Sequence, residues 1–429
     1  MKRVFKNIIV FLVLIGMIFV LIGQTVTAEE EPIVLKMVSA MWLPGEIANT
    51  NRIVKEWNET RDDIKVELTQ ISWPEYRSRM ATSVATGDLP DLIFNSEYLA
   101  YEWFGRGVFT DLNKIASKEQ IAQYHPKAID SCSTVDGELT MIVTQWGANG
   151  HLIYNKNLFE QAGIQAPEME GWTYEEEKEA LQKLTTEDTY GMTFRYTQSA
   201  KVGEKTLPDI WQHGDKFVYY DEEEEGWRVD IGEGTLWAFN HMKEYIDLGI
   251  IPEGVMATTT DSQLAGFLDG KYAIVREGSW FGRLVEDSKP DFEWGIMHPT
   301  RAKEITAPQY QTVGYSITEA CKHKEEAMEF LIYFTTGENG ARYAADTWLC
   351  PATLENFDNP RFKDAKYAPI LAAVEHGHKM PSAAATSLIS ETILPEIAHW
   401  CLAGRITPEE AVVTLRQEVT NALKTYGDW

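Results

Sequence analysis

Short apolar runs alternate with amphipathic helical patterns along this chain, and that alternation restricts the fold more than any other feature. Residues 33–38 form a short apolar run, interrupted only by Lys36, that suits a buried strand, and helical spacing of apolar residues follows as far as Trp57. Residues 64–68 alternate as a strand does, and 91–94 form another short buried run. Strands that alternate with helices indicate βαβ units and a parallel sheet. The sequence therefore predicts an α/β fold.

The same pattern starts again after about residue 140, which indicates a second α/β unit. A chain of 429 residues is too long for one ordinary core. Capping boxes, in which a Ser or Thr precedes a Glu by three residues, predict helices that begin after Ser72, Thr173 and Thr407. Segments 217–220 and 227–229 flank an acidic turn and predict a hairpin.

The N-terminal segment has the pattern of a secretory signal. Lys2, Arg3 and Lys6 are followed by an apolar run over 8–22, and Ala28 closes a stretch of small residues before an acidic sequence. The alternative is a retained membrane anchor, but about 15 apolar residues fall short of the roughly 20 that a span needs. We expect a signal peptide over 1–28 and a mature protein that is exported to the periplasm or the extracellular space and is soluble.

Charge and cysteine usage exclude several classes of protein. The formal net charge is −26, and removal of the signal would make the chain more acidic, which disfavours nucleic acid and anionic membranes as partners. The four cysteines are too widely spaced for a CxxC metal or redox motif: Cys132, Cys321, Cys350 and Cys401. None lies in the signal region, so no lipid-attachment cysteine is predicted.

Catalytic motifs are absent from the sequence. There is no GxSxG elbow, no HExxH zinc motif and no GxxxxGK[ST] phosphate loop. His376 and His378 give only a weak metal signal, and Cys132 has no base near it in sequence. None of the 65 acidic residues stands out as half of a glycosidase pair. We therefore predict no catalytic residue, no metal site and no cofactor.

Tryptophan is the residue type that suggests a ligand. There are fourteen, and several lie in loops beside Gly or Pro, where helix periodicity does not require them: Trp42, Trp146, Trp211 and Trp280. An indole offers a flat apolar face and one N–H donor, which suits the C–H face and hydroxyl rim of a sugar. Loop tryptophans also serve as buried anchors, so this observation alone leaves both interpretations open.

A series of short motifs resembles the extracellular solute-binding family 1, the carbohydrate-binding components of ABC importers. The most specific is ATGDLPDLI at 85–93, which is similar to the family's tGdlPDl signature. Further blocks follow in the family's order, at 107–112, 136–138, 152–159, 171–175, 267–273, 278–280, 325–331 and 404–411. The resemblance runs from about residue 33 to 425 and rests on order and spacing more than on any one block.

The resemblance implies a two-lobed, type II periplasmic-binding-protein-like fold, with a cleft between the lobes and three hinge crossings. It assigns 29–142 and 300–346 to an N-terminal lobe, and 143–299 and 347–429 to a C-terminal lobe. By the family's pattern, strand-end loops, the first crossing, the second lobe and a helix of the C-terminal lobe supply the ligand-binding residues: Trp42, Glu46, Asn95, Ser96, Glu97, Trp146, Trp211, Trp280 and Ser387. The family's frequent proline before the first crossing is missing, since this chain has Met-Ile-Val-Thr at 141–144.

The implied function is to capture a carbohydrate, more specifically an oligosaccharide, in the cleft and to deliver it to the membrane permease of an ABC importer. The protein is expected to act as a monomer. Two alternatives stay open. The same fold could bind a non-sugar ligand or serve as a sensor, or the chain could be a secreted carbohydrate-active enzyme. Cationic ligands would require several cleft carboxylates, for which the sequence offers Glu46 and Glu97.

The first prediction concerns the mature N-terminus. Because 1–28 has the signal pattern, the exported protein should begin near Glu29 and fractionate with soluble proteins. N-terminal sequencing of protein from the native host checks this. Recovery of Met1, or recovery only in the detergent phase, would contradict it.

Overall fold

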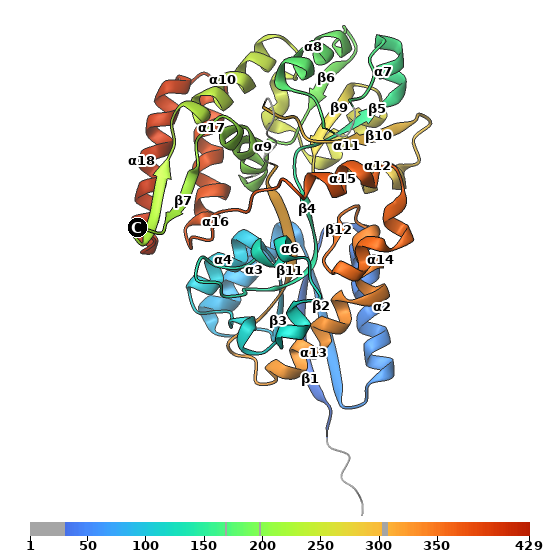
Figure 1. Ribbon diagram of the computed structural model, residues 1–429, viewed down its shortest axis with the longest axis vertical. Coiled ribbons are helices and arrows are strands. Elements are labelled where there is room, and N and C mark those ends of the chain that lie inside the picture. Colours follow the sequence, from blue (N-terminus) through green and yellow to red (C-terminus); the bar gives the residue numbers. More distant parts are fainter. Residues whose placement is uncertain (1–30, 168–169, 197–198, 303–307) are drawn as a thin grey trace, which may run out of the picture.

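The computed structural model describes residues 31–167, 170–196, 199–302 and 308–429. Within this part of the chain the protein has two α/β lobes, each built around its own sheet, and β4 (Ile142–Ala148), a strand of the first sheet, runs toward the second lobe (Figure 1). This confirms the two-lobed α/β fold. The predicted signal peptide, 1–28, lies outside the described residues.

The first lobe contains a six-stranded sheet in the order β12-β4-β11-β3-β1-β2. β1 pairs in parallel with β2 and β3, whereas β11 runs antiparallel to β3 and β4. The strands besides β4 are β1 (Ile33–Met41), β2 (Ile64–Ser72), β3 (Leu92–Ser96), β11 (Tyr310–Ile317) and β12 (Cys350–Pro351).

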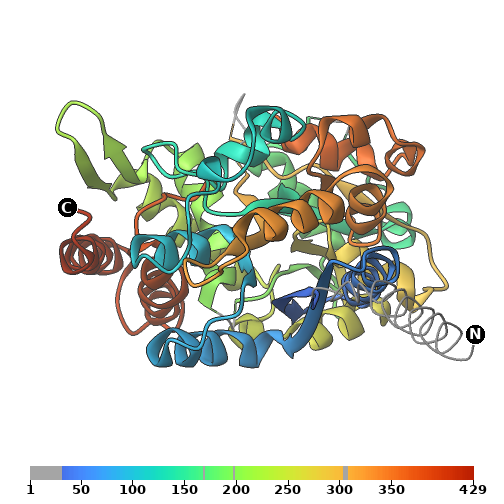
Figure 2. The same cartoon turned by 90° about the horizontal axis from the view of Figure 1, so that it is seen from below.

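Helices cover both faces of this sheet (Figures 1 and 2). They are α2 (Pro44–Thr60), α3 (Trp73–Thr86), α4 (Glu97–Gly105), α5 (Lys118–Ile121), α6 (Pro126–Asp130), α13 (Lys324–Thr335) and α14 (Gly337–Ala345), with 3-10 turns at Leu112–Lys114, Leu354–Asp358 and Pro360–Lys363. The helix α15 (Tyr367–Ala373) lies at the junction with the second lobe. The capping box predicted at Ser72 is wrong. Ser72 is also the last residue of β2, paired with Met41, and its side chain accepts no cap hydrogen bond.

The second lobe contains a four-stranded sheet in the order β10-β5-β9-β6. Its strands are β5 (His151–Asn155), β6 (Tyr190–Thr193), β9 (Tyr272–Glu277) and β10 (Trp294–Met297). The predicted hairpin is β7 (Phe217–Asp221) with β8 (Gly226–Asp230), and it lies beside the C-terminal helix at one end of the molecule (Figure 2).

The second-lobe helices are α7 (Lys156–Ala162), α8 (Tyr174–Leu184), α9 (Ser199–Gln212), α10 (Glu233–Asp247), α11 (Thr260–Leu268), α12 (Phe281–Ser288), α16 (Thr386–Leu388), α17 (Leu394–Leu402) and α18 (Pro408–Tyr426), with a 3-10 turn at Glu253–Ala257 and a short π-helix, η5, at Ile389–Ile393. The capping boxes predicted at Thr173 and Thr407 are confirmed. Each threonine hydroxyl accepts from the main-chain N–H of the Glu three residues on, and the carboxylate of that Glu accepts from the threonine main-chain N–H.

Three chain segments cross between the lobes and hydrogen-bond to one another. Asn149 N–H donates to the Gln309 carbonyl at 2.8 Å. Tyr310 N–H donates to the His378 carbonyl, and His378 N–H to the Pro308 carbonyl, each at 2.8 Å. The crossings therefore form one narrow strip rather than three separate linkers.

Strand pairing places the lobe boundaries later than the sequence implied. β4 continues to Ala148 as a central strand between β11 and β12, so 143–148 belong to the first sheet and not to the second lobe. β12 belongs to the first sheet, and α15, which follows, packs between the lobes against β4 and β10. The chain rejoins the second core at Met380. Of the three expected boundaries, those after 142 and after 346 thus lie too early, because β4 runs to Ala148 and β12 covers Cys350–Pro351.

The first core yields a prediction about stability. Trp57 is buried, donates its indole N–H to the Ile64 carbonyl at 3.1 Å and packs on Phe330. Trp57→Ala should lower the free energy of unfolding by about 3–5 kcal/mol, because truncation leaves a cavity. Trp429→Ala, at a half-exposed position, should change it by less than about 1 kcal/mol. Denaturant titration measures both, and equal effects would contradict the prediction.

Candidate ligand-binding site

A cavity of about 450 Å³ lies between the two lobes. The first lobe supplies Met41, Trp42, Trp73, Phe94, Ser96, Glu97, Tyr98, Gln311 and Val313, and the second supplies Arg195, Glu204, Thr259, Thr260, Asp261, Trp280, Leu284 and Glu391. β1, β3 and β9 all end at this cavity. Its position therefore follows the rule that ligand sites of open α/β sheets lie beyond the carboxyl ends of the strands.

Aromatic side chains from both lobes form one wall. Trp42 meets Trp280 across the lobe interface, with ring centroids 6.3 Å apart and planes at 71°. Trp73 lies parallel to Tyr76 at 5.7 Å and edge-on to Phe94. The three tryptophans belong to three different strand-to-helix junctions, so the wall exists only when both lobes contribute to it.

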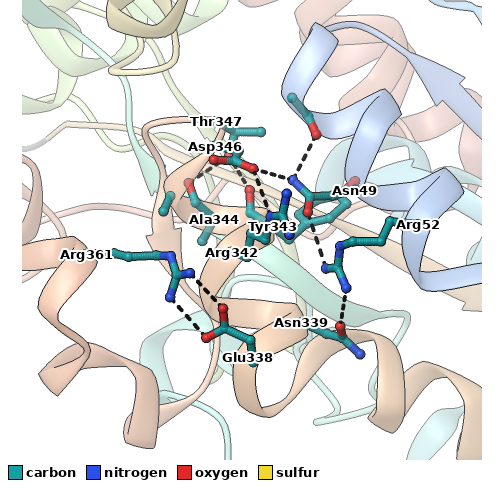
Figure 3. Close-up of polar contacts among 12 residues, drawn as sticks. Asn49, Arg52, Glu338, Asn339, Arg342, Tyr343, Ala344, Asp346, Thr347 and Arg361 are labelled. Atoms are coloured by element: carbon teal, nitrogen blue, oxygen red, sulfur yellow. Dashed lines mark hydrogen bonds and ion pairs between the residues drawn. The ribbon is translucent and has the colours of Figure 1, made fainter. Parts of the chain in front are cut away.

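Packing of α2 on α14 fixes the position of Trp42. A side chain on Gly45 would place its Cβ 2.4 Å from the Asp346 carbonyl oxygen, so only glycine permits this approach. Asn49 donates to the Asp346 carboxylate at 2.8 Å, and Arg52 donates to Asn339 at 2.9 Å (Figure 3). These contacts hold the start of α2, and with it the loop that carries Trp42.

Glu46 lies below that loop and does not line the cavity. Its carboxyl accepts hydrogen bonds from Thr50 and Tyr343, each at 3.1 Å, and is completely buried. Burial raises the pKa of Glu46 from 4.5 to about 7, while these hydrogen bonds and the Trp42 main chain oppose the shift. Glu46 was predicted to bind ligand, but it lies outside the cavity lining and hydrogen-bonds to the main chain of Trp42.

The second lobe contributes a charged wall around Trp280. Lys205 on α9 donates to Glu277 at the end of β9 at 2.8 Å, and both side chains are fully buried. Arg195 donates to Thr260 at 2.5 Å, and its guanidinium lies 5.6 Å from the centre of the Trp280 ring. These contacts connect β9, α9 and the start of α11 directly behind the cavity.

Of the nine positions predicted from the resemblance, four line the cavity: Trp42, Ser96, Glu97 and Trp280. Glu97 also accepts a hydrogen bond from the Thr312 main chain at 3.1 Å. Tyr98, next in the sequence, completes this corner, and burial raises its pKa.

The other four predicted residues besides Glu46 lie outside the lining. Asn95 is buried and donates to Ser316 at 3.1 Å. Trp146 is completely buried in the first core, with its indole N–H on the Pro351 carbonyl at 3.0 Å, because β4 is a central strand. Trp211 stacks on His378 at 5.5 Å. Ser387 accepts a hydrogen bond from Arg77 at the lobe interface.

Several lining residues escaped the sequence interpretation. Trp73 could have been found, since it opens the helix predicted to begin after Ser72. Arg195, Glu204 and Glu391 carry no local signal, because the paths of β6, α9 and η5 bring them to the cavity from distant parts of the chain. The pocket thus contains more carboxylates than the sequence suggested.

Two further features bear on chemistry. All four cysteines are buried and unpaired, and burial raises the pKa of each thiol. Among residues 31–167, 170–196, 199–302 and 308–429, no three His, Cys, Asp or Glu side chains gather as metal ligands.

In the same part of the chain, no helix combines the length and the apolar character required to cross a membrane.

Comparison with known proteins defines the class of protein. The sequence profile of the family described as "Bacterial extracellular solute-binding protein" matches residues 44–341. The chain therefore belongs to that family, in agreement with the resemblance seen in the sequence.

Individual relatives are distant. An uncharacterized lipoprotein of Streptomyces antibioticus is 25% identical over 342 residues, which cover 78% of this chain and 74% of that one. A mannitol-binding protein of Pseudomonas aeruginosa is 26% identical, covering 69% and 68%. The structure of an ABC substrate-binding protein of Listeria monocytogenes in complex with cycloalternan shares the fold, with a TM-score of 0.78, 22% identity and coverage of 93% and 100%.

Glu46 yields a prediction about pH. Because its folded-state pKa is about 7 against 4.5 for the free group, the folded protein keeps a proton that the unfolded chain releases. The free energy of unfolding should therefore fall as pH rises from about 4.5 to 7. Glu46→Gln keeps the acceptor oxygen and removes this dependence, so its stability relative to the wild type should rise by up to about 3 kcal/mol across that window.

Denaturant titrations at several pH values measure the effect. Glu59→Gln, on the same helix with an exposed side chain, is the matched control and should leave the pH profile unchanged. Parallel profiles for Glu46→Gln and the wild type would show that Glu46 is ionised in the folded protein throughout.

Proposed function

We propose that this protein captures a carbohydrate, specifically an oligosaccharide, between its lobes and delivers it to the membrane permease of an ABC importer. The observation that carries the proposal is the cavity wall of Trp42, Trp73 and Trp280 at the junction of the two lobes. Family membership supports the solute-binding role, and the wall supports a sugar as the solute.

The chemistry of the cavity suits a sugar. Indole faces remove the C–H surfaces of pyranose rings from water, at roughly 25 cal/mol per Å². Glu97, Glu204, Gln311 and Arg195 line the same space and offer hydrogen-bond acceptors and donors to hydroxyl groups. At about 450 Å³ the cavity lies within the ~300–1,000 Å³ range of small-molecule sites.

Relatives support the same ligand class. The Pseudomonas relative is named for mannitol, and the Listeria structure contains cycloalternan; both ligands are rich in hydroxyl groups. Delivery to a permease would follow from membership of an extracellular solute-binding family. We further propose that the protein acts outside the cytoplasm as a monomer that binds its sugar without converting it.

A thermal-shift screen tests the proposal. Purified mature protein is heated with a panel of monosaccharides, sugar alcohols and linear and cyclic oligosaccharides, with a polyamine and a peptide mixture as non-sugar probes. A ligand at 100 times its Kd adds about 2.7 kcal/mol to the free energy of unfolding, a readily measured shift. Stabilisation by the polyamine or the peptides and by no carbohydrate would overturn the proposal.

Trp280 gives a prediction for the sugar that the screen identifies. Trp280→Ala should weaken its binding by about 2 kcal/mol or more, roughly thirtyfold, because the variant loses the stacking face contributed by the second lobe. Isothermal titration calorimetry measures the affinity.

The control for that experiment is Trp57→Ala, in the first core. It should lose stability and keep its affinity wherever it remains folded, whereas Trp280→Ala should lose more affinity than stability. Normal affinity in Trp280→Ala, together with a large loss of stability, would make Trp280 a core anchor instead of a binding residue.

A further inference from the structure

A second set of contacts joins the lobes beside the cavity, around Arg77 on α3. Arg77 donates to Ser387 of the second lobe at 2.9 Å and forms an ion pair with Glu391. Glu391 itself lines the cavity, and its carboxylate lies 3.5 Å from the Ser387 hydroxyl. Arg77 of one lobe therefore holds a cavity wall that belongs to the other lobe.

Arg77 is part of a chain of alternating charges. Glu102 on α4 lies 3.7 Å from Arg77 and 2.9 Å from Arg106, and its side chain is nine-tenths buried. Arg106 reaches the second lobe in turn, with a 3.3 Å hydrogen bond to the Tyr426 hydroxyl. The first lobe thus presents two guanidinium groups fixed by one buried carboxylate, and each contacts the second lobe.

The second-lobe side of this contact is also fixed. The Asp428 carboxylate accepts from the main chains of Ala384 and Ala385, at 3.1 and 2.9 Å, directly before α16. The short π-helix η5 follows α16 and carries Glu391; short π-helical segments within helices recur at functional sites. A Cβ on Gly105 would lie only 3.0 Å from Ala384, so the two lobes approach closely here.

We infer that Arg77 is a positioning residue for ligand binding, which orients Glu391 toward the cavity only when the lobes are together and thereby retards ligand release. The inference rests on the proposed carbohydrate capture. Because Arg77 and Glu391 belong to different lobes, their contact forms on closure and breaks on opening. Its loss should therefore act on the dissociation rate far more than on the association rate.

The experiment compares Arg77→Ala, Arg77→Lys and the control Arg79→Ala by stopped-flow fluorescence, with the sugar that gives the largest shift in the screen. Arg79 is on the same helix, in a groove lined only by first-lobe residues. Arg77→Ala should raise the dissociation rate about tenfold, with the association rate within about twofold of the wild type. Arg77→Lys keeps the charge and should restore part of the loss.

A ligand-independent measurement separates this inference from the proposed function. Nitroxide labels on cysteines introduced at exposed Asp88, in the first lobe, and Glu253, in the second, report the distance between the lobes. Arg77→Ala should shift the distance distribution toward longer values, and Arg79→Ala should not. If no sugar binds the wild type, the proposed function fails and this measurement alone decides on the contact. Dissociation rates and distances equal to those of Arg79→Ala would overturn the inference.

Discussion

The strip of three hydrogen-bonded crossings determines where every residue of the cavity can lie. The crossings are joined through main-chain groups of Asn149, Gln309 and His378. These hydrogen bonds therefore do not depend on which side chains these positions carry. The lobes can rotate about such a strip, since a few residues at element ends absorb the change in dihedral angles, but they cannot slide along it. Trp42 and Trp280 therefore meet in one register, although 238 positions of sequence separate them.

Buried charges provide the corresponding constraint inside the second lobe. Lys205 pairs with Glu277, and Arg276 pairs with Asp209 at 2.7 Å, in both cases between α9 and β9. Such pairs add little net stability, because desolvation offsets the attraction, but loss of one partner leaves a buried charge that is strongly unfavourable. Sliding of α9 along β9 would have the same consequence. The distance between Glu204 on α9 and Trp280 after β9 is thus tightly fixed.

The sequence predicted the fold well because the fold depends on local patterns. Strand runs, helical spacing and two of three capping boxes were each visible in a few consecutive residues. Lining residues at strand ends were accessible for the same reason: Ser96 ends β3, Glu97 follows it, and Trp42 follows β1.

The remaining site residues depend on long-range packing. Trp146 has the loop-like context of a ligand residue, but it belongs to a central strand buried on both faces, which only the pairing of β4 with β11 and β12 reveals. Glu391 reaches the cavity from a short π-helix, which shows no recognisable sequence pattern. Both cases concern which strand or helix lies next to which, and that information is distributed over the whole chain.

The free energy of closure explains why both lobes must contribute ligand contacts to the cavity. To move an open–closed equilibrium from 1:99 to 99:1, a ligand must favour the closed state by about 5.5 kcal/mol. The side chains of Arg77 and Arg106 are each 45% exposed, whereas their partner Glu102 is nine-tenths buried; water screens these ion pairs from the arginine side, and each is worth about 1 kcal/mol. They can slow opening, but they are too weak to impose closure. Most of the difference must come from a ligand that touches Trp42 and Trp280 together, because a ligand bound to one lobe alone has equal affinity for both states and shifts nothing. Pairing one aromatic platform from each lobe therefore gives the ligand, more than the rim contacts, control over the balance between the open and the closed state.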